Sequence, residues 1–494
     1  MRQFFILIFL LLTLPTLSQN RGNIWCFGDS AGIDFNQSPP APIRSVCHGR
    51  GSCVSICDTN GGLLFYAATF SAVGNTTKVL DVNNSILPNG DSIVGQAWFH
   101  ELSIASNPLN NGTYYLFSIG VTTSGSTGFY YSIVDMNLNG GLGQVVQKNI
   151  QLQPFQIDDE LSTIKHGNGK DWWVFFRKSS APNDTIYSYL VNELGISNLI
   201  VQKIGSINNA YFKRILFTND GNHAVLTNYA GLIEYLDFDR CSGLFSNPIN
   251  ISNEFDNPYL FGVATSPDDS KLFVSTVLRD TSYVFQYDLN APDIRASKDT
   301  IHVFTYPPSY YEAGEIRLAP DGKMYVNNQY QNGINSPFPY QDSMYNYMNM
   351  NLSVINDPNQ AGAACNFQPY SFYLGGARAY WGLPNNPNYD LPAWHNSICD
   401  TINAVNTIQQ KNPELNVFYH PDWKKLFVNA SALKDGRYDL YITSIDGKQI
   451  YHSLSSALNG YLTTDIPADQ FASGGYIVTL TNQSLKLSVK FVIP

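Results

Sequence analysis

The chain has 494 residues and a formal net charge of −10, from 29 Lys and Arg against 39 Asp and Glu. An acidic chain with no arginine-rich segment repels phosphate backbones, which excludes nucleic acid as a partner. Aromatic residues make up 14% of the chain and charged residues only 14%, a balance typical of a β-rich exported protein. The length allows two or three domains.

Residues 1–18 predict a secretion signal. Arg2 supplies the positive charge, residues 4–14 form an apolar stretch, and Thr16-Leu17-Ser18 supplies small residues suited to cleavage. The apolar stretch is shorter than the roughly 20 residues that a membrane-spanning helix needs. No later segment is apolar enough to cross a membrane, so we expect no transmembrane segment.

Similar turn-plus-strand units then recur about every 50 residues. Each unit is an Asn-Gly, Asp-Gly or Asp-Asp pair followed by a short apolar run, and the pairs begin at Asn60, Asn111, Asn168, Asp220, Asp268 and Asp321. Because a two-residue turn with positive φ favours Asn or Asp followed by Gly, each unit predicts a tight β-hairpin. Strand-only repeats of this length are typical of propeller blades.

The sequence therefore predicts an all-β protein with a β-propeller over residues 19–386. We expect about seven blades, with six or eight also open. The seventh blade is expected to combine residues near 365–385 with the N-terminal strand at Trp25, because strands from both chain ends would close the ring.

Two aromatic groups are candidate ligand contacts. Trp172-Trp173 lies on a predicted strand, where one ring must face each side of the sheet, so core packing is favoured for this pair. The segment 328–359 is rich in Asn, Tyr, Pro and Met and predicts a long loop, and loops of that length are often functional. Its tyrosines are the preferred candidate ligand-binding residues: Tyr340, Tyr345 and Tyr347.

The seven cysteines of an exported chain permit disulfides, and their odd number leaves at least one unpaired. The candidate disulfide is Cys53–Cys365, which would join the first and last parts of a closed ring. Cys47, Cys53 and Cys57 cluster near His48, but zinc sites usually show two close pairs of ligands. A disulfide or buried thiols are therefore preferred there, and no metal or cofactor is assigned.

The sequence offers no catalytic motif. Asp158-Asp159-Glu160 is the one dense run of carboxylates, but such a run is more often a solvated or cation-binding turn. Neither a Gly-x-Ser-x-Gly elbow nor a phosphate-binding glycine loop is present. No catalytic residue is assigned.

Residues 387–412 are rich in Asn and Pro and predict a linker, and residues 413–494 predict a separate small β-sandwich. This tail contains Val-Phe-Tyr-His-Pro at 417–421, a strand ending in Ile-Asp-Gly-Lys at 445–448, Gly-Gly-Tyr-Ile-Val at 474–478 and a basic final strand. It resembles the C-terminal sorting domain of type IX (Por) secretion, found in Bacteroidetes. On that resemblance the sorting residues are Pro421, Asp446, Gly447, Gly475, Tyr476 and Lys490.

The resemblance implies that the type IX secretion machinery is a partner. It also implies an address outside the cell, either secreted or on the external face of the outer membrane.

The body of the chain, from 23 to 386, resembles Bacteroidetes surface propellers related to WD-repeat and Tol-Pal-type propellers. The matches include Trp25 to Phe35 and Ala377 to Pro384. No activity comes with this group.

A second resemblance concerns modification. The pattern of Asp followed by Ser or Thr and then a small or aliphatic residue resembles the O-glycosylation pattern of Bacteroidetes exported proteins. It occurs at Ser30, Ser92, Thr185, Thr300, Ser343 and Thr401.

Two functional hypotheses follow. The preferred one is a non-catalytic surface or secreted binding or adhesion protein, whose propeller presents a site for a glycan or protein ligand. The alternative is an extracellular hydrolase or lyase that acts on polysaccharide or peptide in the central channel of the propeller.

Overall fold

The computed structural model describes residues 20–49, 51–70, 76–95, 99–120, 127–179, 182, 184–207, 212–257, 259–277, 281–305, 310–331, 345–400, 413–421, 424–457, 460–469 and 471–493. The predicted leader, Tyr340, Ser343 and Thr401 lie outside these residues. Within them, no helix is long and apolar enough to span a membrane.

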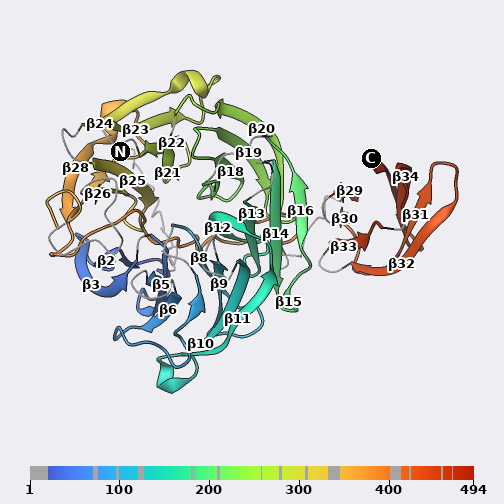
Figure 1. Ribbon diagram of the computed structural model, residues 1–494, viewed down its shortest axis with the longest axis horizontal. Coiled ribbons are helices and arrows are strands. Elements are labelled where there is room, and N and C mark those ends of the chain that lie inside the picture. Colours follow the sequence, from blue (N-terminus) through green and yellow to red (C-terminus); the bar gives the residue numbers. More distant parts are fainter. Residues whose placement is uncertain are drawn as a thin grey trace, which may run out of the picture.

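Over the described residues, seven antiparallel sheets form a ring, so the protein is a seven-bladed β-propeller (Figure 1). The first sheet holds β1 (Ile24–Phe27), β2 (Asp29–Asp34) and β3 (Ala41–His48). Blade 2 holds β4 (Cys53–Cys57), β5 (Leu63–Phe70), β6 (Thr76–Asp81) and β7 (Ile93–Val94). Blade 3 holds β8 (Leu102–Ser106), β9 (Thr113–Gly120), β10 (Gly128–Asp135) and β11 (Gln144–Gln153).

Blade 4 holds β12 (Ile157–Lys165), β13 (Trp172–Lys178), β14 (Thr185–Asn192), β15 (Gly195–Ile196) and β16 (Ile200–Lys203). Blade 5 holds β17 (Arg214–Phe217), β18 (His223–Thr227), β19 (Ile233–Asp239) and β20 (Leu244–Ser252). Blade 6 holds β21 (Leu260–Thr265), β22 (Lys271–Thr276), β23 (Thr281–Asp288) and β24 (Asp299–Thr305). Blade 7 holds β25 (Tyr310–Leu318), β26 (Met324–Gln331), β27 (Asn351–Ile355) and β28 (Phe367–Tyr373). The short 3₁₀ helices η1 (Asn139–Gly141), η2 (Arg295–Ser297) and η4 (Gly362–Cys365) lie in connections.

The first strands of neighbouring blades contact one another, as β4 does with β8, β8 with β12, and β12 with β17. These strands therefore surround the axis of the ring.

The repeated Asn and Asp pairs all lie between the first and second strands of blades 2 to 7, so the hairpin prediction is confirmed. The left-handed residue of each is Gly61, Gly112, Gly169, Gly221, Asp269 or Gly322, with φ between 56° and 90°. The loops are longer than two residues: Gly221 N–H bonds Thr218 O at 3.0 Å, and Thr218 N–H bonds His223 O at 3.0 Å. Only one residue of each pair has positive φ, so the pair ends a longer turn.

The two ends of the ring meet differently from the prediction. The strand at Trp25 lies in its own sheet with β2 and β3, and β28 pairs with β27 of blade 7. The C-terminal end joins the N-terminal sheet through one bridge, between Asp29 and Arg378. The reason is local: β1 to β3 are joined by short connections and pair with one another, which leaves β28 to its own blade.

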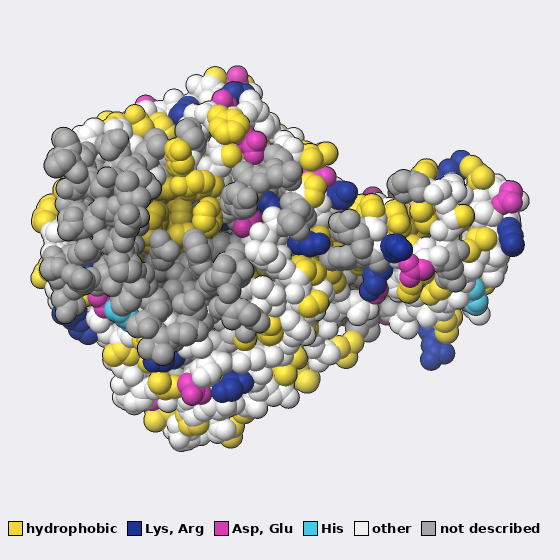
Figure 2. Space-filling view, viewed as in Figure 1, with side chains coloured by type: hydrophobic (Ala, Val, Ile, Leu, Met, Phe, Trp, Pro, Cys, Tyr) yellow, Lys and Arg dark blue, Asp and Glu magenta, His cyan; other side chains and the backbone are white. Residues whose placement is uncertain are grey.

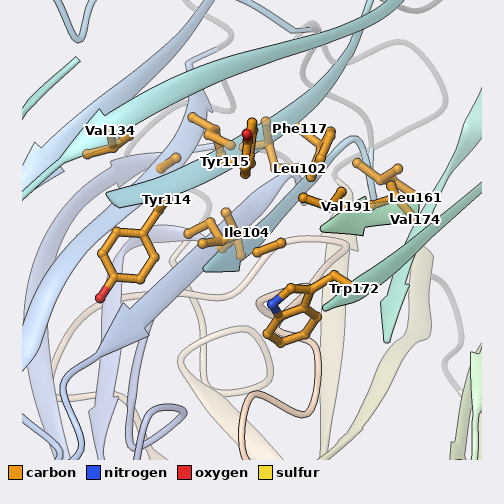
Figure 3. Packing of buried hydrophobic residues seen from close by; sticks show 14 of the residues in the cluster. Leu102, Ile104, Tyr114, Tyr115, Phe117, Val134, Leu161, Trp172, Val174 and Val191 are labelled. Carbon is orange, nitrogen blue, oxygen red and sulfur yellow. The ribbon is translucent and has the colours of Figure 1, made fainter. Parts of the chain in front are cut away.

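The core lies between blades. Trp172 and Trp173 are 1% and 2% exposed, so the preference for core packing is confirmed. Trp172 Nε1 donates to Ser106 Oγ of blade 3, whereas Trp173 Nε1 donates to Arg240 O of blade 5. Figure 3 shows Trp172 and Val174 beside Ile104 and Leu102, where blade 4 packs on blade 3.

The tail forms a β-sandwich of two sheets, as the sequence predicts. One holds β29 (Glu414–His420), β30 (Lys425–Ser431) and β33 (Leu462–Pro467), and the other holds β31 (Gly436–Ser444), β32 (Gln449–Ala457), β34 (Gly474–Thr481) and β35 (Lys486–Ile493). Its own hydrophobic core includes Tyr438, Leu440 and Val478. Phe427 belongs to the hydrophobic cluster of blades 2 to 4, so the sandwich lies beside the propeller (Figures 1 and 2).

The cysteine pairing predicted from the sequence is wrong. Cys53 and Cys365 are free and buried, and the disulfide joins Cys241 to Cys399. Cys53 lies on the first strand of blade 2, whereas Cys365 lies in η4, and the two belong to different hydrophobic clusters. The two positions are therefore not neighbours.

Candidate binding site on the propeller axis

Residues 384–400 form a segment that crosses the ring, here named the axial strap. The residue that fastens it to the first strands is Asn385. The Asn385 amide donates Nδ2–H bonds to Leu102 O at 3.0 Å and Leu161 O at 2.7 Å, and its backbone N–H bonds Cys53 O at 2.9 Å. One residue that bonds the first strands of blades 2, 3 and 4 must lie near the axis, and the orange segment crosses the middle of the ring in Figure 1.

The far end of the strap is fastened to blades 4 and 5. Arg240 Nη2 donates to Pro392 O at 2.7 Å, and Trp394 N–H bonds Gly167 O at 2.7 Å. The Cys241–Cys399 disulfide then holds the end of the strap. Residues 387–400, which the composition assigned to a linker, are therefore packed against the propeller.

A pocket of about 570 Å³ lies between the strap and the first strands of the blades. Pockets of 300 to 1,000 Å³ are typical of small-molecule sites. Its wall comes from residues 384–391 of the strap, from the turn ends of β17, β21 and β25, and from Trp25 and Phe35 of the N-terminal sheet. The pocket thus combines polar groups with an aromatic wall at the face that carries the Asn-Gly and Asp-Gly turns.

A buried ion network lies at the inner end of the pocket, around Glu315. Arg214 Nη2 is 2.6 Å from Glu315 Oε1, and Arg317 Nε is 3.2 Å from the same oxygen. His100 Nε2 is 2.7 Å from Glu315 Oε2. His100, Arg214 and Arg317 also line the pocket, whereas Glu315 is 0% exposed behind them.

The protonation states of this network follow from burial and charge. Burial lowers the pKa of His100 to about 4 despite the neighbouring Glu315, so the ring is neutral at neutral pH and donates Nε2–H. Burial alone would raise the pKa of Glu315, but Arg214, His100 and Arg317 outweigh it and hold the pKa at about 2. The carboxylate is therefore ionised and faces two guanidinium groups.

A second charged group lies beside the first. Lys213 Nζ is 3.8 Å from Asp158 Oδ2, and both side chains are buried. Arg177 Nη2 donates to Arg214 O at 3.3 Å. The run 158–160, for which the sequence favoured a turn, lies instead within β12, the first strand of blade 4.

The carboxylic acids at the pocket bear on the hydrolase alternative. Glycoside hydrolysis needs two carboxyl groups on opposite sides of the scissile bond. Asp390 is the only carboxylic acid among the described residues that line the pocket, and burial raises its pKa. Glu315 is held by three partners and does not reach the lining.

The candidate tyrosines lie elsewhere. The Tyr345 hydroxyl donates to Asp29 Oδ2 at 2.7 Å, and its ring lies 4.2 Å from the Arg378 guanidinium, so Tyr345 belongs to the contact that closes the ring. Tyr347 is 64% exposed beside Tyr370. Tyr340 lies outside the described residues. A ligand site at these tyrosines stays a prediction.

The candidate O-glycosylation residues differ in access. Ser92 and Thr300 are exposed, Ser30 is half-buried, and Thr185 is only 2% exposed. Ser343 and Thr401 lie outside the described part of the chain. A bulky glycan needs a surface position, which Ser92 and Thr300 have, and O-glycosylation stays a prediction.

The candidate sorting residues lie at a turn, in the core and on the surface of the sandwich. Asp446 and Gly447 form the turn from β31 to β32, where Gly447 has φ of 89°. Tyr476 of β34 is buried next to Gly475, Lys490 lies exposed on β35, and Pro421 follows β29.

The sequence analysis missed His100, Arg214, Glu315 and Arg317 because they lie in three separate stretches of the chain. One signal was present: each lies on, or directly before, the strand that precedes a repeated turn. In a propeller that strand lines the axis, so charged residues at this place in several units would converge.

Residues 416–494 match the model of the secretion system C-terminal sorting domain family. This domain marks the protein as cargo of the type IX secretion machinery. Such cargo is secreted or attached to the cell surface. Among curated proteins, none matches the chain.

Several solved structures resemble the chain at low identity. They include a functionally unknown protein from Desulfotomaculum acetoxidans DSM 771 (14% identity, TM-score 0.40, 73% of this chain and 98% of that one). Others are a putative 6-phosphogluconolactonase from Bacteroides fragilis NCTC 9343 (11%, 0.43, 75% and 98%) and the periplasmic gluconolactonase PpgL of Pseudomonas aeruginosa (10%, 0.37, 80% and 99%). At these values the likenesses carry no inference about activity, and the propeller is established by its sheet topology.

Proposed function

We propose that the protein is a non-catalytic binding or adhesion protein, exported through a cleaved N-terminal leader and the type IX machinery of a Bacteroidetes cell. The tail provides translocation across the outer membrane and surface attachment. The propeller provides the binding site, and the ligand is a glycan held in the axial pocket.

The observation that carries this proposal is the axial pocket itself. It is preformed, because the strap is held by Asn385 at the axis and by the Cys241–Cys399 disulfide at the edge of the ring. A rigid site avoids the entropic cost of ordering loops on binding. Its lining offers hydrogen-bonding groups next to the rings of Trp25 and Phe35, a combination suited to hydroxylated rings.

The test is a glycan-array screen of the mature full-length protein with two variants. Asn388→Trp places a bulky side chain at an exposed strap position on the pocket wall. Tyr347→Ala alters the exposed tyrosine on the connection before β27. We expect binding that Asn388→Trp abolishes and Tyr347→Ala leaves unchanged. The reverse pattern would transfer the site to the tyrosines, and a screen without any binding would contradict the glycan assignment.

A further inference from the structure

The tail has a pair of aromatic side chains on the outer face of its own sandwich. Phe418 of β29 lies opposite Phe427 of β30 in the register of the sheet, and their ring centres are 6.5 Å apart. Side chains alternate between the two faces of a strand. Leu426 and Val428, the neighbours of Phe427, fill the core of the sandwich, so Phe427 points away from that core. Phe427 is nevertheless only 2% exposed.

The propeller covers this pair. Phe427 belongs to the hydrophobic cluster of blades 2 to 4, Phe418 packs against the same cluster, and β30 contacts β16 of blade 4. Lys203 Nζ of β16 lies 5.2 Å from the centre of the Phe418 ring, a cation–π contact. An apolar ring on the outer face of a sheet gains free energy from such a cover. The two phenylalanines therefore anchor the tail on the propeller.

A second part of the contact lies beside the disulfide. The Tyr461 ring of the tail lies 6.3 Å from the His166 ring of blade 4, at 87° to it. His166 Nε2 lies 2.9 Å from Cys241 O. A Cβ atom at Gly167 would clash with Cys399 Sγ, so the backbone after His166 packs directly on the disulfide. His166 and Gly167 thus connect the tail contact with both cysteines.

The tail presents one of its two sheets to the propeller. The residues that contact blades 4 and 5, or line the cleft of about 240 Å³ beside them, lie on or next to β29, β30 and β33; they include Phe418, Phe427, Asn429, Tyr461 and Thr463. The other sheet, β32-β31-β34-β35, carries Lys490 and the turn 446–447. The candidate sorting residues therefore lie mainly on the sheet that is not engaged in these contacts.

We propose that the side of blades 4 and 5 that bears the disulfide is a docking surface for the sorting tail, which holds the tail without a covalent link and depends on the Cys241–Cys399 bond. Phe418 and Phe427 anchor the tail, and Tyr461 adds a contact that needs the disulfide to fix His166 and Gly167. An oxidised propeller thus binds its tail more tightly than a reduced one. This inference is independent of the proposed glycan binding.

The test uses the mature full-length chain with the recognition sequence of a specific protease inserted between Val405 and Asn406. The folded chain is cut there, and size-exclusion chromatography shows whether propeller and tail elute together. We expect co-elution from the native chain. A fluorescent label on the tail then gives the Kd of the complex.

Two variants form a matched pair. Phe427→Ser and Leu454→Ser both replace an apolar side chain of the sandwich, but Leu454 is 57% exposed on β32 of the other sheet. We expect Phe427→Ser to raise the Kd at least about tenfold through the lost apolar contact. Leu454→Ser should leave it unchanged. The tryptophan fluorescence of each uncut chain, compared with that of the native chain, controls for folding.

The dependence on the disulfide has its own measurements. Cys399→Ser should raise the Kd about fivefold or more, the size of a typical coupling between two sites. Coupling is reciprocal, so removing the tail from the cut native chain should make the disulfide easier to reduce in a thiol buffer by a similar factor. This second measurement keeps the native cysteines and needs no variant to fold.

Three results would overturn the inference. If propeller and tail of the native chain separate after the cut, the docking surface does not exist. Equal effects of Phe427→Ser and Leu454→Ser would place the contact elsewhere. A Kd that Cys399→Ser leaves unchanged, with a disulfide that is reduced equally with and without the tail, would remove the dependence on oxidation.

Discussion

Asp29 and Arg378 lie 349 residues apart in the chain and form a buried ion pair that joins the two ends of the propeller. Arg378 Nη2 is 3.1 Å from Asp29 Oδ2, and the Arg378 backbone bridges the same residue. His48 and Tyr345 also bond the Asp29 carboxylate. Burial would raise the pKa of Asp29, but His48, Tyr345 and Arg378 together lower it.

Arg378→Met should therefore destabilise the propeller strongly, because it leaves Asp29 buried without its cationic partner. Breaking one side of a buried ion pair costs about 3–5 kcal/mol. Urea unfolding followed by tryptophan fluorescence measures the change. The matched control is Lys170→Ala, which removes an exposed pair with Glu193 and should cost less than about 1 kcal/mol. Equal effects of both variants would show that Arg378 does not close the ring.

The Cys241–Cys399 disulfide should stabilise the fold and hold the strap. It links residues 158 apart in the sequence, and loss of a native disulfide typically costs about 2–5 kcal/mol. Cys399→Ser should lower the melting temperature and increase proteolysis within 384–400. Cys365→Ser, at a free buried thiol, should leave strap proteolysis unchanged. Mass spectrometry without reductant that finds Cys241 alkylated would contradict the pairing.

Acid should destabilise the protein through His166. The His166 Nε2 atom lies 2.9 Å from Cys241 O, and its Nδ1 accepts the Asn168 N–H, so the ring is bonded as the neutral form. Burial lowers its pKa from 6.5 to about 4. The unfolded state therefore binds the proton first, and the contribution of His166, complete above about pH 6.5, is lost as the pH falls toward 4.

The measurement is the free energy of unfolding between pH 7.5 and 4 for the native chain and His166→Gln. We expect the variant to be less stable at pH 7.5 and to lose less stability on acidification. His452→Gln serves as control, because His452 is half exposed on the sandwich. An unchanged pH slope in His166→Gln would exclude this titration as a source of acid sensitivity.

Asn385→Ala should destabilise the axis. It removes the donor to Leu102 O and Leu161 O and the acceptor of the Arg317 Nη2–H bond at 2.6 Å. Unsatisfied buried polar groups cost about 1–3 kcal/mol. Asn388→Ala, at an exposed position of the same strap, should change the stability by less than about 0.5 kcal/mol. Denaturant titration compares the two, and equal losses would argue against the axial role of Asn385.

Deletion of residues 413–494 should abolish surface delivery, because the matched sorting domain lies within them. Cell fractionation with an antibody to the propeller measures where the protein accumulates. We expect the truncated chain inside the outer membrane and the intact chain outside it. Undiminished surface delivery of the truncated chain would contradict the sorting role of the tail.

The repeat, the strand class and the tail were predictable because each depends on local sequence. The Asn-Gly and Asp-Gly pairs favour a left-handed residue at the turn, and five such pairs with one Asp-Asp pair at a regular spacing predict blades. The sorting domain has its own short strands and its own core, with Tyr438 and Leu440 at alternating positions. Both predictions needed no knowledge of distant contacts.

The site was decided by closure of the ring. His100, Arg214 and Glu315 lie on three different blades, and their meeting depends on the radius and register of seven packed sheets. The path of residues 384–400 depends on backbone carbonyl groups of several first strands, which accept hydrogen bonds from Asn385 near the axis. Composition does not reveal these contacts, and the Asn- and Pro-rich composition of the segment therefore indicated a linker. The pairing of Cys241 with Cys399 follows from that path. Local propensity thus determined the blades and the tail, and only long-range packing around a common axis placed the strap, the disulfide and the buried charges.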